Sequence, residues 1–277
     1  MRSFITLALY LGAVAASELK TRFHLVLGLS GITEGAHDVF YVTGANTTSN
    51  NTGNLPKNAT HTWEVDFTKD GDNSKIKLLC RPTAPTRFNG LARFNDTILL
   101  ATASYQDSIF AFDTRIGRIW EAIKQESLMS SINGIKVSDS FVYWTANSAL
   151  AIPNVTAGTG QLIFQGSAFD DFAVSPSGFA LNSTYSANYK FAYLSTSAGN
   201  TIEQVIFTRN GTTIGSEIIA GSEDLTEVAE PTGVFFGRGE GQLNKIYVTT
   251  GGGSGVNVDV NGTETAVGAQ LLGIQLS

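Results

Sequence analysis

The sequence has few of the residues that cross-link or stiffen a chain. Its 277 residues include one cysteine, Cys80, together with six prolines and three histidines. A single cysteine excludes an internal disulfide, so the fold must be stable through its own hydrophobic core. With 42% hydrophobic residues, the chain is long enough to bury such a core as one large domain or two smaller ones. We expect Cys80 to be a buried thiol.

Basic clusters and long apolar runs are also scarce. The net charge is -6 and Lys and Arg are not clustered, which argues against a nucleic-acid partner. One apolar run, residues 4–14, follows Arg2 and precedes a stretch of small residues, so residues 1–16 read as a signal peptide. No later run reaches the length of a membrane span. We therefore expect residues 17–277 to form a single soluble domain of the secretory pathway, secreted or lumenal.

Asparagine sequons are frequent in the sequence that follows this leader. Each has the pattern N-x-S/T, and none has proline at the middle position. In a secretory protein this pattern marks acceptors for N-linked glycans, which must lie in surface loops. The predicted acceptors are Asn46, Asn50, Asn58, Asn95, Asn154, Asn182, Asn210 and Asn261.

Short alternating runs separated by polar turns make up most of the chain, which also contains 29 glycines. The clearest pair runs from Ser131 to Ser148, where a loosely alternating run meets an aromatic and β-branched run across a polar turn. This pattern predicts a β-hairpin. The pair Asn133-Gly134 at its entrance is compatible either with a turn residue that tolerates positive φ or with an amide aimed at a ligand.

The same hairpin pattern recurs along the chain at intervals of roughly 40 to 60 residues, near the length of one four-stranded propeller blade. We predict an all-β fold, a β-propeller of five or six four-stranded blades whose ring is closed by pairing of the N- and C-terminal strands. A short strand expected at Phe23 to Leu29 is the candidate closing strand. A jelly roll or sandwich is the alternative, although neither requires the middle strand to repeat so closely. The polar residues that open successive inner strands are aligned as Thr33, Asn89, Asn133, Asp170 and Thr232.

The first residues of the inner strands should converge at one mouth of the central channel. We therefore predict Asn89, Asn133 and Asp170 as catalytic residues, with Asp171 and Thr232 contacting the substrate. Carboxylate and amide oxygens are also ligands for calcium, so the same three residues are the predicted metal ligands if a metal is bound. The structural alternative is that these side chains cap strand ends and bond to the backbone.

Three aromatic residues lie close in sequence to these polar positions. Phe88, Trp144 and Phe169 are candidate walls of a pocket for a hydrophobic small molecule, and core packing is the alternative role for each of them. Motifs typical of nucleophilic hydrolases, zinc peptidases and nucleotide-binding enzymes are absent from the sequence.

Several segments resemble, in order, the fungal branch of the senescence marker protein, gluconolactonase and luciferin-regenerating enzyme family. These segments include GITEGAHDVFYVTG, FNGLA, SINGIKVSDSFVYWTANS, DDFAV and EPTGVFFGRGEGQLNKIYVTTGG, and the resemblance covers about residues 30 to 276. It implies a calcium-type ion held by a glutamate, two asparagines and an aspartate, of which the last three map to Asn89, Asn133 and Asp170. The family glutamate belongs to a blade that precedes the first recognisable unit, and Glu34 does not match it. The resemblance therefore implies a weakened metal site.

The resemblance also implies three kinds of function. The favoured one is an enzyme of specialised metabolism that promotes a cycloaddition or cyclisation without a cofactor, similar to the hetero-Diels-Alderases that join a quinone methide to a terpene. The second is a calcium-dependent lactone or ester hydrolase, and the third is a binding propeller without catalytic activity. The sequence does not indicate an oligomeric state.

Overall fold

The computed structural model describes residues 28–45, 58–68, 75–82, 86–125, 127–139, 141–147, 149–153, 160–166, 168–181, 188–238, 242–253 and 258–276. The predicted signal peptide lies outside this part of the chain, as do residues 23–27 of the predicted closing strand. The sequon residues Asn46, Asn50, Asn154 and Asn182 also lie outside it.

Four antiparallel sheets, called blades 1 to 4, follow one another along the chain, and each contains four strands in sequence order. Blade 1 contains β1 (Gly28–Glu34), β2 (Val39–Ala45), β3 (Thr60–Asp66) and β4 (Lys75–Cys80), and blade 2 contains β5 (Phe88–Arg93), β6 (Ile98–Ala103), β7 (Ser108–Asp113) and β8 (Arg118–Lys124). Blade 3 contains β9 (Ile132–Ser138), β10 (Phe141–Ala146), β11 (Ala149–Pro153) and β12 (Gly160–Gln165). Blade 4 contains β13 (Phe172–Val174), β14 (Tyr189–Ser195), β15 (Thr201–Thr208) and β16 (Thr213–Gly221).

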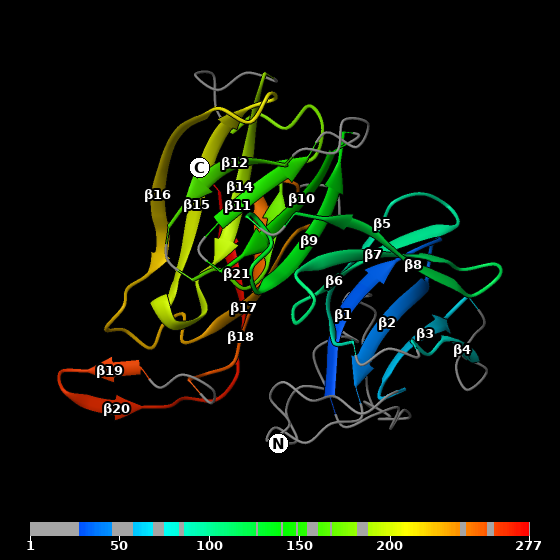
Figure 1. Ribbon diagram of the computed structural model, residues 1–277. Coiled ribbons are helices and arrows are strands. Elements are labelled where there is room, and N and C mark those ends of the chain that lie inside the picture. Colours follow the sequence, from blue (N-terminus) through cyan, green and yellow to red (C-terminus); the bar gives the residue numbers. More distant parts are fainter. Residues whose placement is uncertain are drawn as a thin grey trace.

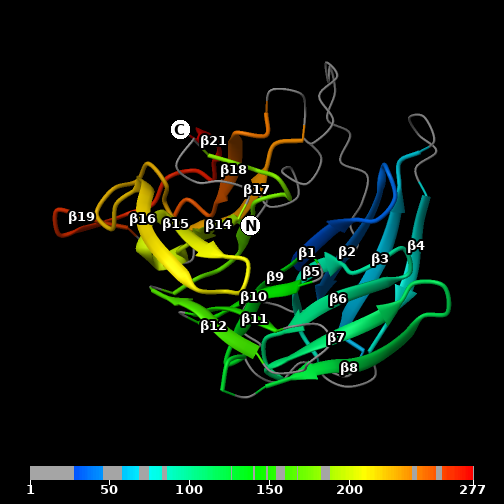
Figure 2. The same cartoon turned by 90° about the horizontal axis from the view of Figure 1, so that it is seen from above.

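Blade 5 has three strands among the described residues, β17 (Pro231–Phe236), β18 (Lys245–Thr250) and β21 (Leu271–Gln275). A separate hairpin of β19 (Val258–Val260) and β20 (Thr263–Thr265) extends away from it (Figure 1). In the view from above, β1, β5, β9 and β17 lie near the centre, and β4, β8, β12 and β16 lie at the rim (Figure 2). The predicted all-β propeller is therefore confirmed, with five blades.

The hairpin predicted between Ser131 and Ser148 forms the inner half of blade 3. β9 and β10 pair in antiparallel register, with Val137 opposite Val142 and Ile135 opposite Trp144. Asp139 makes the turn with a φ of 51°, a left-handed conformation that Asp tolerates because its short side chain can bond locally. The polar turn residues between two runs rich in β-branched residues thus predicted this hairpin correctly.

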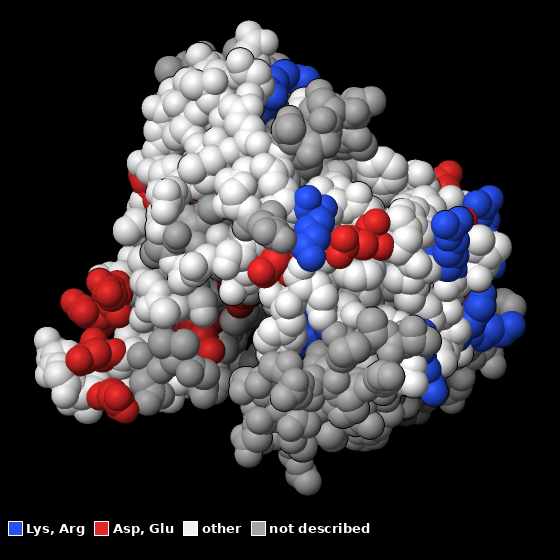
Figure 3. Space-filling view, in the orientation of Figure 1, with Lys and Arg blue, Asp and Glu red and all other residues white. Residues whose placement is uncertain are grey.

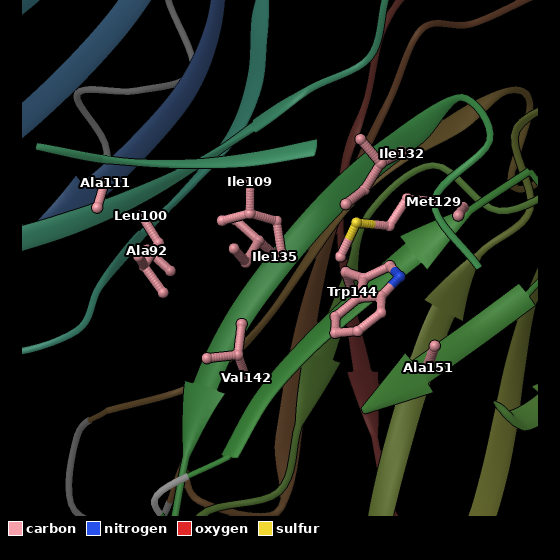
Figure 4. Close-up of a cluster of buried hydrophobic side chains, with 11 residues drawn as sticks. Ala92, Leu100, Ile109, Ala111, Met129, Ile132, Ile135, Val142, Trp144 and Ala151 are labelled. Carbon is pink, nitrogen blue, oxygen red and sulfur yellow. The ribbon is translucent and has the colours of Figure 1, made fainter. Parts of the chain in front are cut away.

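Apolar side chains pack between neighbouring blades. One cluster joins blades 2 and 3 and includes Ile109, Ile132, Ile135 and Trp144, each with 0% exposure (Figure 4). Two further clusters join blade 3 to blade 4 and blade 4 to blade 5. Cys80 belongs to the cluster between blades 1 and 2 as a free, buried thiol, as predicted, and burial raises its pKa to about 11.

Glycines near the start of the inner strands allow these strands to approach one another closely. A Cβ atom on Gly31 would lie 2.3 Å from the carbonyl oxygen of Asn89, and one on Gly90 would lie 2.6 Å from that of Asn133. Because real Cβ atoms do not approach so closely, only glycine fits these positions. The structural counterpart of Asn89 in blade 1 is therefore Ser30, which precedes Gly31, and not Thr33 as the sequence alignment had it.

The first and last blades meet through an ion pair between Glu34, at the end of β1, and Arg238, just after β17. Among the described strands, β1 pairs with β2 and β21 pairs with β18. On the face shown in Figure 3, Lys and Arg gather over the side of β4 and β8, Asp and Glu gather near β19 and β20, and groups of both signs lie next to each other near the centre. Within the described part of the chain, we find no helix with the length and apolar character needed to span a bilayer.

Candidate functional site

A repeated hydroxyl connects the entries of the inner strands. Thr102 on β6 accepts a hydrogen bond from the Gly90 amide (2.7 Å) and donates one to the carbonyl oxygen of Asn133. One blade further on, Thr145 on β10 accepts from the Gly134 amide (2.9 Å) and donates to the carbonyl oxygen of Asp170 (2.7 Å). Each hydroxyl therefore ties the inner strand of its own blade to the entry of the next one.

This arrangement holds the dipeptide Asp170-Asp171 firmly. The Asp170 amide donates to the Ser195 carbonyl oxygen (2.9 Å), and the Gly134 amide donates to the Asp170 carbonyl oxygen (3.1 Å). The Asp171 amide donates to the Ser195 hydroxyl (3.0 Å), which donates back to the Asp171 carbonyl oxygen (2.8 Å). The main chain of Asp170 and Asp171 is thus hydrogen-bonded to both blade 3 and blade 4.

A pocket of about 250 Å³ opens at this end of blades 3 and 4. Its lining combines one carboxyl group, two amides, two hydroxyls and one aromatic ring. The lining residues are Ser131, Asn133, Asn147, Ala168, Phe169, Asp170 and Ser197. Of the sequence-predicted site residues, the structure brings Asn133, Phe169 and Asp170 together in this pocket.

Three of the lining residues have left-handed backbone conformations, with φ of 53° at Ser131, 52° at Asn147 and 44° at Ser197. Such conformations are uncommon for serine and persist only where the surroundings impose them. At Ser131 the backbone amide donates to the Asp107 carboxylate (2.9 Å), which comes from the neighbouring blade. The rim of the pocket is therefore held in a defined shape.

Asp170 has the most distinctive electrostatic environment of the pocket. Burial raises its pKa to about 7, and the negative charge of Asp171 acts in the same direction. A hydrogen bond from the Asn133 side chain opposes the shift, and the charges of Glu230 and Lys136 raise and lower the pKa respectively. A carboxyl group that titrates near neutral pH can exchange a proton with a bound molecule, which an ordinary surface aspartate cannot do efficiently.

The other predicted polar residues lie outside this pocket. Asn89 is half-buried and donates from Nδ2 to the Ser104 hydroxyl (3.4 Å). Thr232 contacts Thr249 within blade 5 through its hydroxyl (3.4 Å). Asp171 is engaged by Lys136, whose Nζ lies 2.7 Å from Oδ1 and 2.8 Å from Oδ2. None of these three residues is among the residues that line the pocket.

Two of the three aromatic residues predicted to line the pocket, Trp144 and Phe88, instead pack in the core between blades. Trp144 is 0% exposed in the cluster between blades 2 and 3, and its indole Nε1 donates to the Leu128 carbonyl oxygen (2.7 Å) (Figure 4). Phe88 is 1% exposed and packs edge-to-face on Phe112 at 4.9 Å between ring centroids. Neither lines the pocket, because alternation along each strand turns these side chains into the blade interfaces. Phe169 is the aromatic residue of the pocket.

The sequence predictions did not identify Ser131, Asn147 and Ser197 as pocket residues, or Lys136 and Thr145 as their supports. A signal for Thr145 was present, because a hydroxyl residue stands at the same place near the end of β6, β10 and β14. Ser131 lies in the turn just before β9, Asn147 in the turn after β10, and Ser197 at the start of a short 3-10 helix (Ser197–Gly199) after β14. Sequence alone does not show which of these segments meet.

The donor atoms available for a metal ion are few. Ca²⁺ takes six to eight oxygen ligands and usually several carboxylates. The pocket offers one carboxylate, from Asp170, and the Asn133 amide is already bonded to it. Among the residues that the structure describes, no group of three or more His, Cys, Asp and Glu side chains is placed to hold an ion. This donor set does not fit calcium well, and we derive no chemical step through a metal.

Four sequon asparagines fall within the described residues. Asn58, Asn95, Asn210 and Asn261 are all exposed, and each lies in a turn or just before a strand. Asn95 and Asn210 lie in the turns after β5 and β15, at the end of these blades opposite the inner-strand entries. Glycosylation of these residues stays a prediction, and their positions are accessible to it.

Comparison with protein-family models finds no match, and comparison with curated proteins finds no relative. Solved structures with a similar fold do exist. Regucalcin from Agrobacterium tumefaciens, a calcium-binding protein, has 16% identity and a TM-score of 0.51, covering 87% of this chain and 74% of that one. A catalytically inactive virginiamycin B lyase from Staphylococcus aureus with quinupristin has 17% identity and a TM-score of 0.51, covering 79% of this chain.

The chain spans 62% of the length of that lyase. A nidogen/laminin complex contains a further similar chain, with 11% identity and a TM-score of 0.54, covering 80% of this chain and 72% of that one. At such low identities the likeness concerns the fold alone. The chain is similar to β-propellers of the regucalcin and virginiamycin B lyase kinds, and its function must be argued from its own site.

Proposed function

We propose that this protein is a small-molecule enzyme whose pocket promotes a cyclisation or cycloaddition without a cofactor, with Asp170 as the acid that activates the substrate. One observation carries the proposal: a half-buried carboxyl group with a pKa raised to about 7 lines a pocket between two blades. A carboxylic acid kept neutral near pH 7 can donate a strong hydrogen bond to a substrate oxygen.

In the proposed mechanism, protonated Asp170 donates a hydrogen bond to the carbonyl or quinone-methide oxygen of the substrate. This draws electron density from the conjugated system and makes it more reactive toward an alkene. Two new bonds form as π bonds are consumed, no atom is lost, and the proton stays on Asp170 or returns to it. The amide of Asn133 holds the carboxyl group in place from the neighbouring strand.

The rest of the pocket would orient the reactants. Phe169 offers an apolar face, and the polar side chains of Ser131, Asn147 and Ser197 offer hydrogen bonds at the rim. Holding reacting groups in a productive geometry supplies roughly 7 to 11 kcal/mol of a barrier. The volume of about 250 Å³ limits the pocket to a small ring system or to the reactive end of a larger molecule.

The motifs shared with the fungal branch of the gluconolactonase-type family support this choice, because the resemblance implies non-hydrolytic members that join a quinone methide to a terpene. The small number of oxygen ligands that the pocket offers to a calcium ion is a second observation that supports the cofactor-free reaction. The substrate proposed here is an apolar molecule with one conjugated carbonyl or quinone-methide oxygen.

The test uses an ortho-quinone methide, generated in the assay, with an alkene partner. We expect the protein to raise the rate of cycloaddition and to favour one stereoisomer. The Asp170→Asn variant should lose about 10²-fold or more of this acceleration, and Asp224→Asn, an exposed residue outside the pocket, should retain it. A product ratio equal to that in buffer for several such pairs would refute the proposed activity.

Calcium-dependent hydrolysis of a lactone or ester is the second candidate, and the positions of Asn133 and Asp170 favour it because they match the metal ligands implied by the resemblance.

The dependence of activity on pH distinguishes the two candidates. An acid role for Asp170 requires activity to fall as the pH rises through about 7, whereas a role as metal ligand or base requires activity to rise. Lactone turnover that is abolished by a chelator and restored by calcium would establish the hydrolase; ligand binding without turnover of either substrate would indicate a binding propeller.

A further inference from the structure

Two turns at the end of the ring opposite the pocket carry sequons that the proposed function does not use. Asn95 lies in the turn between β5 and β6, and Asn210 lies in the turn between β15 and β16. Both residues are exposed. An N-linked glycan requires an accessible asparagine amide and a hydroxyl residue two positions later, so the geometry of each turn decides how well its sequon can serve.

The side-chain amide of Asn95 is fixed by its own turn. Its Oδ1 accepts hydrogen bonds from the amides of Thr97 and Ile98, both at 2.9 Å, and from the Thr97 hydroxyl at 3.3 Å. Because the side-chain amide is planar, bonding through Oδ1 turns Nδ2 away from the main chain of the turn. The hydroxyl that the sequon requires is thus already in contact with the acceptor amide.

The turn at Asn210 repeats this arrangement in blade 4. The Oδ1 atom of Asn210 accepts hydrogen bonds from the hydroxyls of Thr208 and Thr212, the latter at 3.2 Å and belonging to the sequon. Among the described residues, the Nδ2 atoms of Asn95 and Asn210 have no hydrogen-bond partner. Both acceptor nitrogens therefore face solvent from a preformed turn.

The sequon of Asn58 differs from these two. Asn58 is exposed, but its hydroxyl residue Thr60 is 2% exposed and donates to the carbonyl oxygen of Thr86. That bond joins residues 26 positions apart and belongs to the folded blade, whereas the bonds at Asn95 and Asn210 join residues two positions apart. Turns closed by a side chain over two residues can form before the chain folds, when a glycan is attached.

We propose that Asn95 and Asn210 are preferred acceptors for N-linked glycans, and that the two glycans cover the end of the ring opposite the pocket. The donor is an oligosaccharide carried on a lipid diphosphate. A bond forms between Nδ2 and the anomeric carbon of the sugar, the bond from that carbon to the diphosphate oxygen breaks, and Nδ2 releases one proton. The pocket end of blades 3 and 4 stays accessible to a substrate. This inference is independent of the proposed catalytic activity.

The first experiment expresses the full chain in a eukaryotic host cell and maps the occupied asparagines by mass spectrometry, after enzymatic release of the glycans in H₂¹⁸O. We expect higher occupancy at Asn95 and Asn210 than at Asn58. Asn95→Asp and Asn210→Asp keep the oxygen that closes each turn and should each lose one glycan, whereas Asn58→Asp should keep the intact mass nearly unchanged. Thr97→Ser should retain the glycan on Asn95, and Thr97→Val should lose it.

The second experiment tests the covering by limited trypsin digestion. Arg209 is 53% exposed and directly precedes Asn210, so a glycan there should shield the peptide bond after this arginine. Thr212→Val, which removes the sequon, should be cleaved after Arg209 faster than the wild type, and Thr212→Ser should be cleaved at the wild-type rate. When both are made in bacteria without glycans, Thr212→Val and the wild type should be cleaved equally.

Two results would overturn the inference: Asn95 and Asn210 without glycan in the protein from the eukaryotic host, or occupancy of Asn58 as high as theirs. Cleavage after Arg209 at the same rate with and without the glycan would refute the covering. If a variant is not produced, the occupancy map of the wild type still decides. Neither experiment needs a substrate, so failure of the cycloaddition assay does not affect them.

Discussion

At the scale of single residues, environment decides what each side chain does. Asp170 and Asp171 are adjacent and chemically identical, yet one lines a pocket under a hydrogen bond from Asn133 and the other is paired with Lys136. Burial separates their chemistry further, because it makes the charged form of Asp170 unfavourable. The stability of the protein must therefore depend on the protonation of this group.

The first prediction concerns pH and stability. The pKa of Asp170 rises from 3.8 to about 7 on folding, so its stabilising contribution is complete below about pH 4 and is lost as the pH rises through about 7. Between about pH 5 and about pH 8 the wild type should lose roughly 2 to 3 kcal/mol of unfolding free energy relative to Asp170→Asn. Urea denaturation of both proteins at these pH values measures the difference. Parallel pH dependences of the two proteins would show that Asp170 does not titrate in this range.

The second prediction tests whether Trp144 packs the core or contacts a ligand. Trp144 is 0% exposed and bonds to the Leu128 carbonyl oxygen, so Trp144→Ala should lower the unfolding free energy by about 3 to 5 kcal/mol. Ile116→Ala, at a residue that is 70% exposed, should change it by less than about 0.5 kcal/mol. The less disruptive Trp144→Phe should retain ligand affinity, measured by calorimetry. A selective loss of affinity in this variant would show that Trp144 contacts the ligand.

At the scale of elements, the inner strands pack closely because they carry glycines and because hydroxyl groups on the adjacent strands bond to the main chain of the next blade. Gly31 and Gly90 leave space for the carbonyl oxygen of the next blade, and Thr102 and Thr145 bond to such oxygens. The entries of successive blades are thereby linked into one chain of hydrogen bonds that ends at Asp170. The position of the acid thus depends on elements two blades away.

The third prediction compares two glycines within strands. A Cβ atom on Gly90 would meet the Asn133 carbonyl oxygen at 2.6 Å, whereas one on Gly215 would have no atom within 4 Å. Gly90→Ala should therefore lower the unfolding free energy by about 1 to 3 kcal/mol, because the backbone of blade 3 must move. Gly215→Ala should be neutral or stabilising by up to about 1 kcal/mol. Equal effects of the two substitutions in chemical denaturation would show that Gly90 is not packed closely against the main chain of blade 3.

At the scale of the whole molecule, the junction between the first and last blades differs from the others within the described residues. There, apolar clusters join each of the other neighbouring pairs of blades, and an ion pair between Glu34 and Arg238 connects blade 1 to blade 5. Arg238 is 72% exposed, so this interaction contributes on the order of 1 kcal/mol or less and is weakened by salt.

The fourth prediction is that the ring opens first at this junction. Glu34→Gln removes the charge but keeps an oxygen that can accept the bond from the Asp38 amide, so the local turn should persist. We expect faster hydrogen exchange in β1 and β17 and unchanged exchange in β9 and β10. A uniform increase across all blades would show that the ion pair supports the whole fold. Exchange that does not change at all would show that the junction is held by other contacts.

Much of the fold was predictable because each blade repeats a pattern that is local in sequence. Alternating runs ending at polar turns indicated β9 and β10, and the recurrence of these runs indicated a propeller. The outermost strands were harder to identify: β8 and β16 are partly exposed on both faces, so their residues do not alternate clearly. The alignment of Thr33 with Asn89 was wrong because the register of blade 1 depends on the contact between Gly31 and blade 2.

The sequence by itself determined the strand-and-turn repeat, the buried thiol of Cys80 and the polar residues that open the inner strands of blades 2 to 5. Only the tertiary structure decided which of these polar residues share a pocket, because residues 131, 147, 170 and 197 come from different segments between strands that packing between blades 3 and 4 brings together. It also decided that Trp144 is a core residue and that the pKa of Asp170 is raised to about 7. Burial and the charge of neighbouring groups are properties of the folded ring, and no local sequence pattern contains them.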